Sequence, residues 1–257
     1  MAEPIALERL LPWHELRASA LYLDVDGTLL DIAPTPDAVV VPAGLIAALG
    51  RIGAHLGGAL ALVSGRPVGA LDRLFRPLRL AAVGIHGAEV RTAGDPPRTA
   101  DYLARQLDGI RDALATRIAE WPGAFVEDKG LALALHHRAS PVDERVIGRA
   151  MAALADLAGP EFVLLHGKAV FELKPAALSK ATGIATLHGT AKFAGRRPVC
   201  IGDDLTDESA FEYAGEMQGI SVRVGDAGPT MAQYRVNTPG EVRAWLAHLA
   251  ATAEGAP

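Results

Sequence analysis

Short apolar segments alternate along this chain with longer segments of helical periodicity, and this alternation limits the folds open to it. The strand-like segments are 20–25, 59–65, 80–87 and 197–204. The helical segments include 42–56, 179–189 and 240–250. Strands that alternate with helices predict an α/β fold in which helices cover both faces of a parallel sheet. In such sheets the ligand site lies at the carboxyl ends of the strands.

Two of the predicted strands end in aspartates. The segment LYLDVDGTLL (21–30) places Asp24 and Asp26 before a glycine that allows a sharp turn. The segment IGDDLTDE (201–208) adds Asp203, Asp204 and Asp207. A turn or a helix N-terminus would accommodate one acid, but so many together repel one another. The spacing around the glycine does not fit a calcium loop, whereas Mg²⁺ with oxygen ligands would relieve the repulsion.

Two further features suggest chemistry on a phosphoryl group. The segment LVSGRP (62–67) ends a predicted strand in the hydroxyl of Ser64. Lys180 opens a predicted helix. Carboxylates, a hydroxyl, a lysine and a divalent cation together are typical of a phosphoryl-transfer site.

The middle of the chain has a different pattern. The Pro/Gly-rich segment GDPPRTAD (94–101) predicts a turn or hinge. The elements expected after it are a helix (101–120), strands (124–128 and 131–138), a second helix (141–157) and a β-hairpin (161–175). We therefore predict a second, smaller α/β domain at 96–176, inserted into a core made of residues 1–95 and 177–257.

The order D-x-D-G-T, S-G-R, K and G-D-D resembles that of haloacid dehalogenase superfamily phosphatases. Additional segments are similar to the trehalose-6-phosphate phosphatase family. They are DVDGTLLDIAPTPDAVVVP, GIHGAE, EDKGLALALHHR and FELKP, and with the motifs above they extend from about residue 20 to 208. The resemblance implies a Rossmann-like parallel-sheet core with an inserted α/β cap that sets substrate specificity.

The resemblance also implies residue roles. Asp24 would be the nucleophile that forms an aspartyl-phosphate, and Asp26 the general acid and then the general base. Mg²⁺ would be held by Asp24, the Asp26 carbonyl and Asp203, with Asp204 or Asp207 acting through water. The residues expected to contact the phosphoryl group are Ser64, Thr28 and Lys180. The sequence has Ala181 where the family has a glycine after the lysine, so Lys174 is the alternative lysine.

Substrate recognition is expected from the inserted domain. Glu127 and Lys129 are two residues apart and so share one face of a strand. By resemblance these two and Glu172 contact trehalose hydroxyls, although an exposed salt bridge of little energetic value is the alternative. Further residues assigned to substrate binding are Arg66, His86, His136, Arg138 and Lys168.

These features predict a Mg²⁺-dependent phosphatase that hydrolyses trehalose 6-phosphate. The alternatives are a related phosphatase for sucrose phosphate or a glycosyl phosphoglycerate, a phosphomutase, and an inactive sugar-phosphate sensor. The net charge of −5 does not suggest a nucleic-acid partner. No apolar run is long enough to span a membrane, and a signal peptide is not evident. The single cysteine, Cys200, fits a reducing compartment, and we expect a cytoplasmic protein. We also expect a monomer.

Overall fold

The structure, a computed structural model, describes residues 3–93, 95–99, 101–167, 169–225 and 228–252. It divides into two compact units, which we call the core unit and the inserted unit. The core unit is Met1–Arg98 with Lys180–Pro257, and the inserted unit is Thr99–Ser179. These boundaries lie three residues later than those predicted from the sequence.

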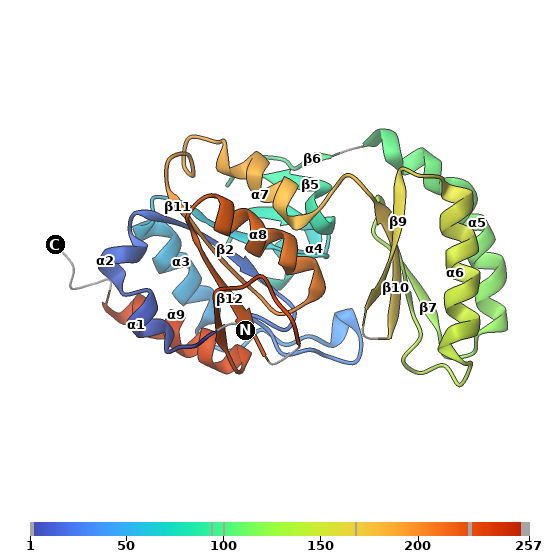
Figure 1. Ribbon diagram of the computed structural model, residues 1–257, viewed down its shortest axis with the longest axis horizontal. Helices are drawn as coiled ribbons and strands as arrows, with labels where there is room; N and C mark the ends of the chain where they lie inside the picture. Colours follow the sequence, from blue (N-terminus) through green and yellow to red (C-terminus); the bar gives the residue numbers. More distant parts are fainter. Residues whose placement is uncertain (1–2, 94, 100, 168, 226–227, 253–257) are drawn as a thin grey trace. The chain divides into compact units, whose positions relative to one another are not determined.

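The core unit is built on one mixed sheet whose described strands follow the order β1-β13-β12-β11-β2-β3-β4-β5-β6 (Figure 1). The pairs from β1 to β4 are parallel, and β4 pairs with β5 antiparallel. The strands are β1 (Glu3–Pro4), β2 (Ser19–Asp24), β3 (Leu60–Val63), β4 (Ala81–Gly84), β5 (Glu89–Arg91), β6 (Arg98–Thr99), β11 (Arg197–Gly202), β12 (Ile220–Val224) and β13 (Tyr234–Val236). The predicted α/β class with a parallel core sheet is confirmed.

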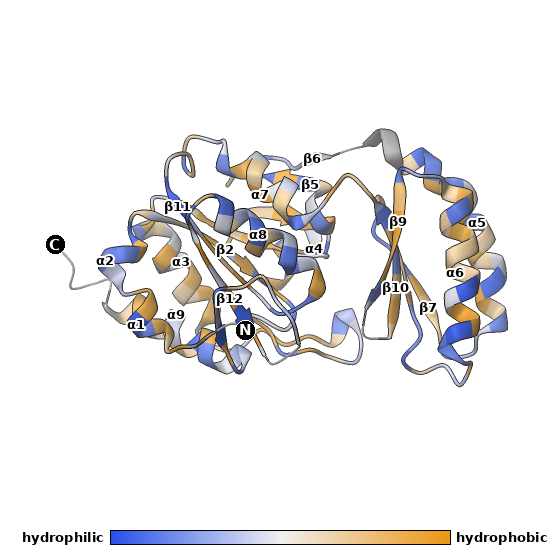
Figure 2. Cartoon of the chain, in the orientation of Figure 1, coloured by the Kyte–Doolittle hydropathy of each residue, from blue (hydrophilic) through white to orange (hydrophobic). Residues whose placement is uncertain are grey.

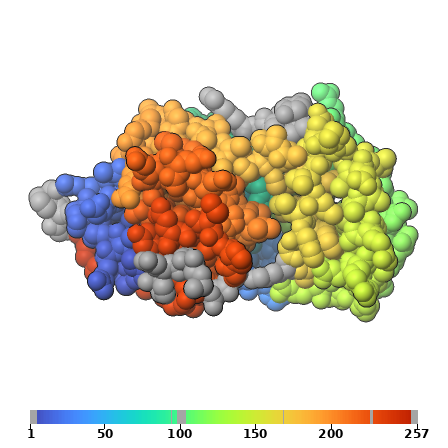
Figure 3. All heavy atoms as spheres, in the orientation of Figure 1, coloured from blue at the N-terminus to red at the C-terminus, as the bar shows by residue number. Residues whose placement is uncertain are grey.

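Helices cover both faces of this sheet, which is why its central strands are mostly apolar and buried. The helices are α1 (Leu7–Leu10), α2 (Trp13–Leu16), α3 (Leu45–His55), α4 (Val68–Leu74), α7 (Lys180–His188), α8 (Glu208–Glu216) and α9 (Pro239–Thr252). Figure 1 shows α7 and α8, which contact each other, in front of the strands, with α3 behind them. In Figure 3 the residues of α7 and α8 form a continuous surface over the front face. Buried strand positions are coloured as hydrophobic in Figure 2.

The connections out of β2 and β11 place a crevice at the carboxyl end of the sheet. β2 leads through α3 to β3 on one side, whereas β11 leads through α8 to β12 on the other side. The chain therefore departs in opposite directions from two neighbouring strands. In open α/β sheets this switch point is where ligands bind, and Asp24 and Asp203 both lie there.

The inserted unit has its own antiparallel sheet, in the order β7-β8-β10-β9. Its elements are α5 (Asp108–Arg117), β7 (Phe125–Asp128), β8 (Leu133–His136), α6 (Glu144–Ala158), β9 (Phe162–Gly167) and β10 (Val170–Pro175), with 3₁₀ segments at Asp101–Leu107 and Ile118–Glu120. α5 and α6 contact each other, and α6 packs on β9 and β10. The apolar side chains of Leu135 and Phe171, paired in register, are buried on the helix side. The residues next to Leu135 on β8 and next to Phe171 on β10 therefore face the other side of the sheet.

Two sequence expectations need local correction. The strand predicted over 80–87 ends at Gly84, because Ile85 and His86 take left-handed backbone conformations with φ of 44° and 50°. The predicted hinge at 94–101 includes a short strand, β6. Within the described residues, no helix has both the length and the apolar character needed to cross a membrane.

Candidate active site

Asp24 is the last residue of β2, in the middle of the core sheet. β2 lies between β3 and β11, so the carboxyl ends of three strands meet around its side chain. Oδ1 accepts a hydrogen bond of 2.8 Å from Nζ of Lys180. Oδ2 is buried and, among the described residues, has no hydrogen-bond partner. Burial raises the pKa of Asp24 to about 8, although Lys180 opposes the rise.

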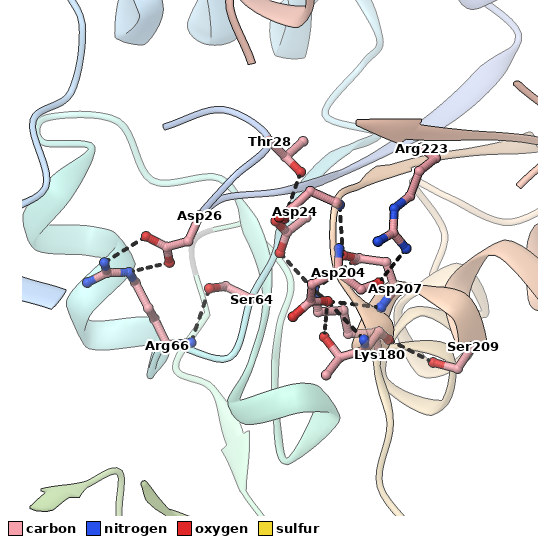
Figure 4. Close-up of polar contacts among 12 residues, drawn as sticks. Asp24, Asp26, Thr28, Ser64, Arg66, Lys180, Asp204, Asp207, Ser209 and Arg223 are labelled. Carbon is pink, nitrogen blue, oxygen red and sulfur yellow. Dashed lines mark hydrogen bonds and ion pairs between the residues drawn. The ribbon is translucent and has the colours of Figure 1, made fainter. Parts of the chain in front are cut away.

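The loop after β11 brings the second group of acids to the same place (Figure 4). Asp204 caps the 3₁₀ turn Leu205–Asp207 by accepting from Thr206 and Asp207 backbone amides. Oδ2 of Asp207 in return accepts from the amides of Asp203 and Asp204, each at 3.1 Å. The helix-capping alternative is therefore correct for Asp204 and Asp207, but it is only part of what Asp207 does.

Lys180, the first residue of α7, is the cation at the centre of these acids. Its Nζ lies 2.7 Å from Oδ1 of Asp207, in addition to its bond with Asp24, and 3.6 Å from Oδ1 of Asp204. Burial alone would lower the pKa of Lys180, but the surrounding carboxylates hold it well above its usual value. Lys174, the alternative lysine, lies on β10 and donates to the carbonyls of Pro175 and Leu178. The geometry therefore favours Lys180.

The close approach of α7 to the sheet depends on Gly183. A Cβ atom there would lie 2.3 Å from Cγ1 of Val83 and 2.9 Å from Cα of Gly87. The helix that carries Lys180 thus has its glycine three residues after the lysine, and Ala181 does not prevent the lysine from reaching Asp24.

Three acids are arranged so that they could hold a metal ion. One oxygen from each of Asp24, Asp203 and Asp207 lies within 4.8 Å of the other two. Burial raises the pKa of Asp203 to about 7, with the charges of Asp204 and Asp207 adding to the rise. Three carboxylates, one of which has a buried oxygen without a hydrogen-bond partner among the described residues, fit a hard divalent cation. The third acid of this triad is Asp207 and not Asp204.

Asp26 and Ser64 lie at the same edge of the sheet with different partners from those expected (Figure 4). The carboxylate of Asp26 accepts from Nε and Nη2 of Arg66, at 2.6 and 2.7 Å. Ser64 is buried directly after β3, and its Oγ accepts from the amide of Arg66 at 3.1 Å. The hydroxyl of Thr28 is directed to Oδ1 of Asp203 at 3.5 Å. Arg66, assigned to the substrate by sequence, thus contacts Asp26, and Thr28 contacts the acid loop.

In the inserted unit, polar residues gather on the sheet face opposite α5 and α6. Lys129 donates to Oε1 of Glu172 at 3.0 Å. Oε2 of Glu127 lies 2.9 Å from Nε2 of His136, whose ring stacks on Phe125. Glu127 and Glu172 both align with Ala134 in the sheet register, so the four polar residues form one cluster.

The sequence assigned three further residues to substrate binding. His86 is buried in the turn after β4, in the core unit. Arg138 is exposed after β8. Lys168 lies outside the described residues.

Sequence reasoning missed Arg223, which stabilises the acid loop. This buried residue on β12 donates to the carbonyl of Asp204 at 3.1 Å and to Glu208 at 2.7 Å. An arginine inside the otherwise apolar segment 220–224 was the signal, because a charge there needs a buried partner.

The parallel sheet, with acids at its switch point, has the fold of haloacid dehalogenase superfamily phosphatases. Phosphatases of this superfamily are among the solved structures that the protein resembles. Residues 22–239 match the model of the trehalose-phosphatase family, and the chain belongs to that family. A solved trehalose-6-phosphate phosphatase related protein matches with a TM-score of 0.78 and 26% identity, over 91% of this chain and 98% of its own.

Two curated relatives are similar along most of their length. The trehalose-6-phosphate phosphatase of Escherichia coli is 41% identical over 93% of this chain and 90% of its own length. The probable trehalose-phosphate phosphatase of Sinorhizobium fredii is 42% identical over 82% of this chain and 79% of its own length.

Proposed function

We propose that this protein hydrolyses trehalose 6-phosphate to trehalose and inorganic phosphate. The family match over residues 22–239 carries the proposal. Members of this family are phosphoric monoester hydrolases. Of two relatives above 40% identity, one is named a trehalose-6-phosphate phosphatase and the other a probable trehalose-phosphate phosphatase. The site supports the reaction class, because a buried aspartate with a lysine partner lies beside an acid triad.

In the first step a carboxylate oxygen of Asp24 attacks phosphorus, and the bond between phosphorus and the sugar oxygen breaks. Lys180 fixes one oxygen of Asp24 and so orients the other. The same ammonium offsets negative charge on the transferring phosphoryl group. Ser64, whose Oγ accepts from Arg66, retains its hydroxyl hydrogen for a phosphoryl oxygen.

Asp26 completes the proton transfers of both steps. It gives a proton to the departing sugar oxygen, then takes one from the water that attacks the aspartyl-phosphate. That second attack releases phosphate and restores Asp24. Its position two residues after the nucleophile, in the loop that directly follows β2, supports this assignment.

We assign Mg²⁺ to Asp24, Asp203 and the carbonyl of Asp26, with Asp207 as the third carboxylate of the triad. When bound, the ion supplies positive charge that draws electron density from the phosphoryl oxygens. The chain's contribution is to hold the carboxylates close together, which Gly27 allows by leaving room for Asp203.

We assign recognition of the sugar to the inserted unit. The cluster of Glu127, Lys129, His136 and Glu172 presents acceptors and donors side by side, which suits sugar hydroxyls. Its partly buried ion pair also argues against a purely exposed salt bridge, since the side chains of Lys129 and Glu172 are only 9% and 11% exposed.

Phosphate release from a panel of substrates tests the proposal. With Mg²⁺, we expect kcat/KM for trehalose 6-phosphate to exceed that for sucrose 6-phosphate, glucose 6-phosphate and p-nitrophenyl phosphate by about a hundredfold, or roughly 2.7 kcal/mol. Equal and slow turnover of all four compounds would be consistent with the proposed phosphatase chemistry but would rule out trehalose 6-phosphate as the specific substrate. Isomerised sugar phosphate without free phosphate would indicate a mutase.

Asp24→Asn tests the nucleophile in the same assay. We expect kcat to fall by at least about a thousandfold, because an amide cannot form the aspartyl-phosphate. Asp37→Asn, on an exposed residue of the following loop, is the matched control and should keep full activity. Turnover by Asp24→Asn close to that of the control would reject the covalent mechanism.

A further inference from the structure

Asp26 has to hold its carboxyl group at a defined place beside the reacting atoms. It nevertheless lies on a loop, and its side chain is 36% exposed. A partly exposed carboxylate in a loop has several accessible rotamers. Small displacements of a catalytic group cost rate steeply. Something other than burial must therefore fix this side chain.

Arg66 supplies that restraint. Its guanidinium binds both oxygens of Asp26 in a fork, through Nε and Nη2 at 2.6 and 2.7 Å. Bidentate pairs of this kind restrict orientation as well as distance. Nη1 of the same guanidinium donates to the carbonyl of Pro36 at 3.0 Å. One side chain thus holds the loop that carries Asp26 at two points.

The backbone of Arg66 is itself held in place by hydrogen bonds. The amide of Arg66 donates to Oγ of Ser64 at 3.1 Å, and its carbonyl accepts from the amide of Ile85 at 3.1 Å. The backbone between β3 and α4 is therefore fixed to the turn after β4. The side chain of Arg66 is 12% exposed, which limits its alternative positions.

Asp26 is turned by this pair to a specific side of the site. Figure 4 shows its carboxylate directed to Arg66, away from the group formed by Asp24, Lys180 and Asp207. In an in-line displacement the leaving oxygen lies opposite the attacking oxygen. A carboxylate held away from Asp24 is on the side where the leaving oxygen and, later, the attacking water are expected.

We propose that Arg66 is a positioning residue that acts through Asp26, rather than a substrate-binding residue. This inference rests on the proposed function, because it assigns the orientation of the acid and base in that reaction. It differs from the role that the sequence resemblance suggested, in which Arg66 would contact the substrate directly.

A double-mutant cycle with Arg66→Gln and Asp26→Asn separates the two roles. If Arg66 acts through Asp26, Arg66→Gln lowers kcat/KM for trehalose 6-phosphate by about tenfold or more in the otherwise unchanged protein, and by less than about twofold in the Asp26→Asn background. Arg73→Gln, on an exposed arginine of α4, is the control. Equal losses in both backgrounds would overturn the proposal, since Arg66 would then act without Asp26.

Two additions keep the test decisive. Arg66→Lys keeps the positive charge but cannot form the fork, so it replaces Arg66→Gln in the cycle if the latter fails to fold. Amide hydrogen exchange needs no turnover: either Arg66→Gln or Asp26→Asn should accelerate exchange over 25–38 and leave 197–202 unchanged. Unchanged exchange at 25–38 would overturn the proposal. Absence of turnover by the unmodified protein would instead count against the proposed function.

Discussion

Gly27 shows how closely the acid site depends on a single residue without a side chain. Its φ is +89°, and a Cβ atom there would lie 2.2 Å from Oδ2 of Asp203. The backbone of the loop after β2 therefore contacts a carboxylate that the metal triad needs. An added Cβ could be accommodated only if the carboxylate of Asp203 moved away from its place in the triad, and the left-handed backbone strain would remain.

Gly27→Ala should consequently lower both stability and activity. We expect a loss of about 2 kcal/mol or more in the free energy of unfolding, from the left-handed backbone and from displacement of Asp203, and at least a tenfold fall in kcat. Gly44→Ala is the matched control, because Gly44 has φ +83° with nothing within 4 Å of the added atom. It should show the strain alone, about 1 kcal/mol, with normal kcat. Equal effects of the two variants on kcat would contradict the argument.

The secondary-structure elements differ in how far the sequence predicts them. β2, β3 and β11 are buried on both faces and are therefore apolar runs that periodicity detects. β5, at Glu89–Arg91, pairs antiparallel near the sheet edge and contains two charged residues in three, so no apolar run marks it. The helix beginning at Lys180 was predicted to within one residue, because apolar spacing follows the lysine.

The sequence predicts those site residues that lie at the end of a recognisable strand or at the start of a recognisable helix. Asp24, Asp203 and Lys180 are of this kind, and the structure brings them together. The pairing of Asp26 with Arg66 and the contact of Gly27 with Asp203 are not, since they join loops distant in sequence. Such pairings depend on the register of β2 against β3 and β11, which the sequence does not specify.

At the scale of the inserted sheet, the polar cluster offers a test of sugar recognition. Lys129→Met and Glu172→Gln remove the ion pair while keeping side-chain volume. We expect the double variant to raise KM for trehalose 6-phosphate by about tenfold, because the hydroxyl contacts are lost, with kcat changed less than about threefold. Turnover of p-nitrophenyl phosphate, which lacks a sugar, should be unaffected.

The control for this prediction lies on the helix side of the same unit. Asp156→Asn changes an exposed carboxylate on α6 and should leave both substrates unaffected. If the double variant also leaves KM for trehalose 6-phosphate unchanged, the cluster is a structural ion pair, and sugar recognition must be sought elsewhere.

For the whole molecule, the acid site is a source of instability that a cation can remove. Four carboxylates, those of Asp24, Asp203, Asp204 and Asp207, surround the single ammonium of Lys180 or adjoin it. Folding places this excess negative charge in a buried site, and the pKa of Asp24 and that of Asp203 rise to about 8 and about 7. Activity and stability should therefore respond together to pH and to Mg²⁺.

The carboxyl groups of Asp24, Asp203 and Asp207 hold protons more tightly in the folded protein than in the unfolded chain, because burial raises the pKa of each. Through these groups the metal-free folded protein binds more protons than the unfolded chain between about pH 4 and pH 8. The contribution of these acids to the free energy of unfolding should fall as pH rises through that window, whereas His137 and His188, whose pKa burial lowers from 6.5, contribute in the opposite direction in the lower part of it. Lys180, whose pKa is raised from 10.5, contributes no pH dependence there. Mg²⁺ at about 100 times its Kd should add about 2.7 kcal/mol at pH 8, where the ligands bind as carboxylates, and less at pH 5.

Calorimetry of the protein with EDTA or with Mg²⁺, at pH 5 and pH 8, measures both effects. Asp203→Asn should weaken them, because it removes one of the three carboxyl groups with a raised pKa and one metal ligand, whereas Asp37→Asn should behave as the unmodified protein does. A metal-free melting temperature that changes between pH 5 and pH 8 as it does in Asp203→Asn, or a Mg²⁺ effect that persists unchanged in Asp203→Asn, would contradict the assignment. The first result would mean that Lys180 already compensates the buried acids, and the second that the cation binds at a place other than the triad.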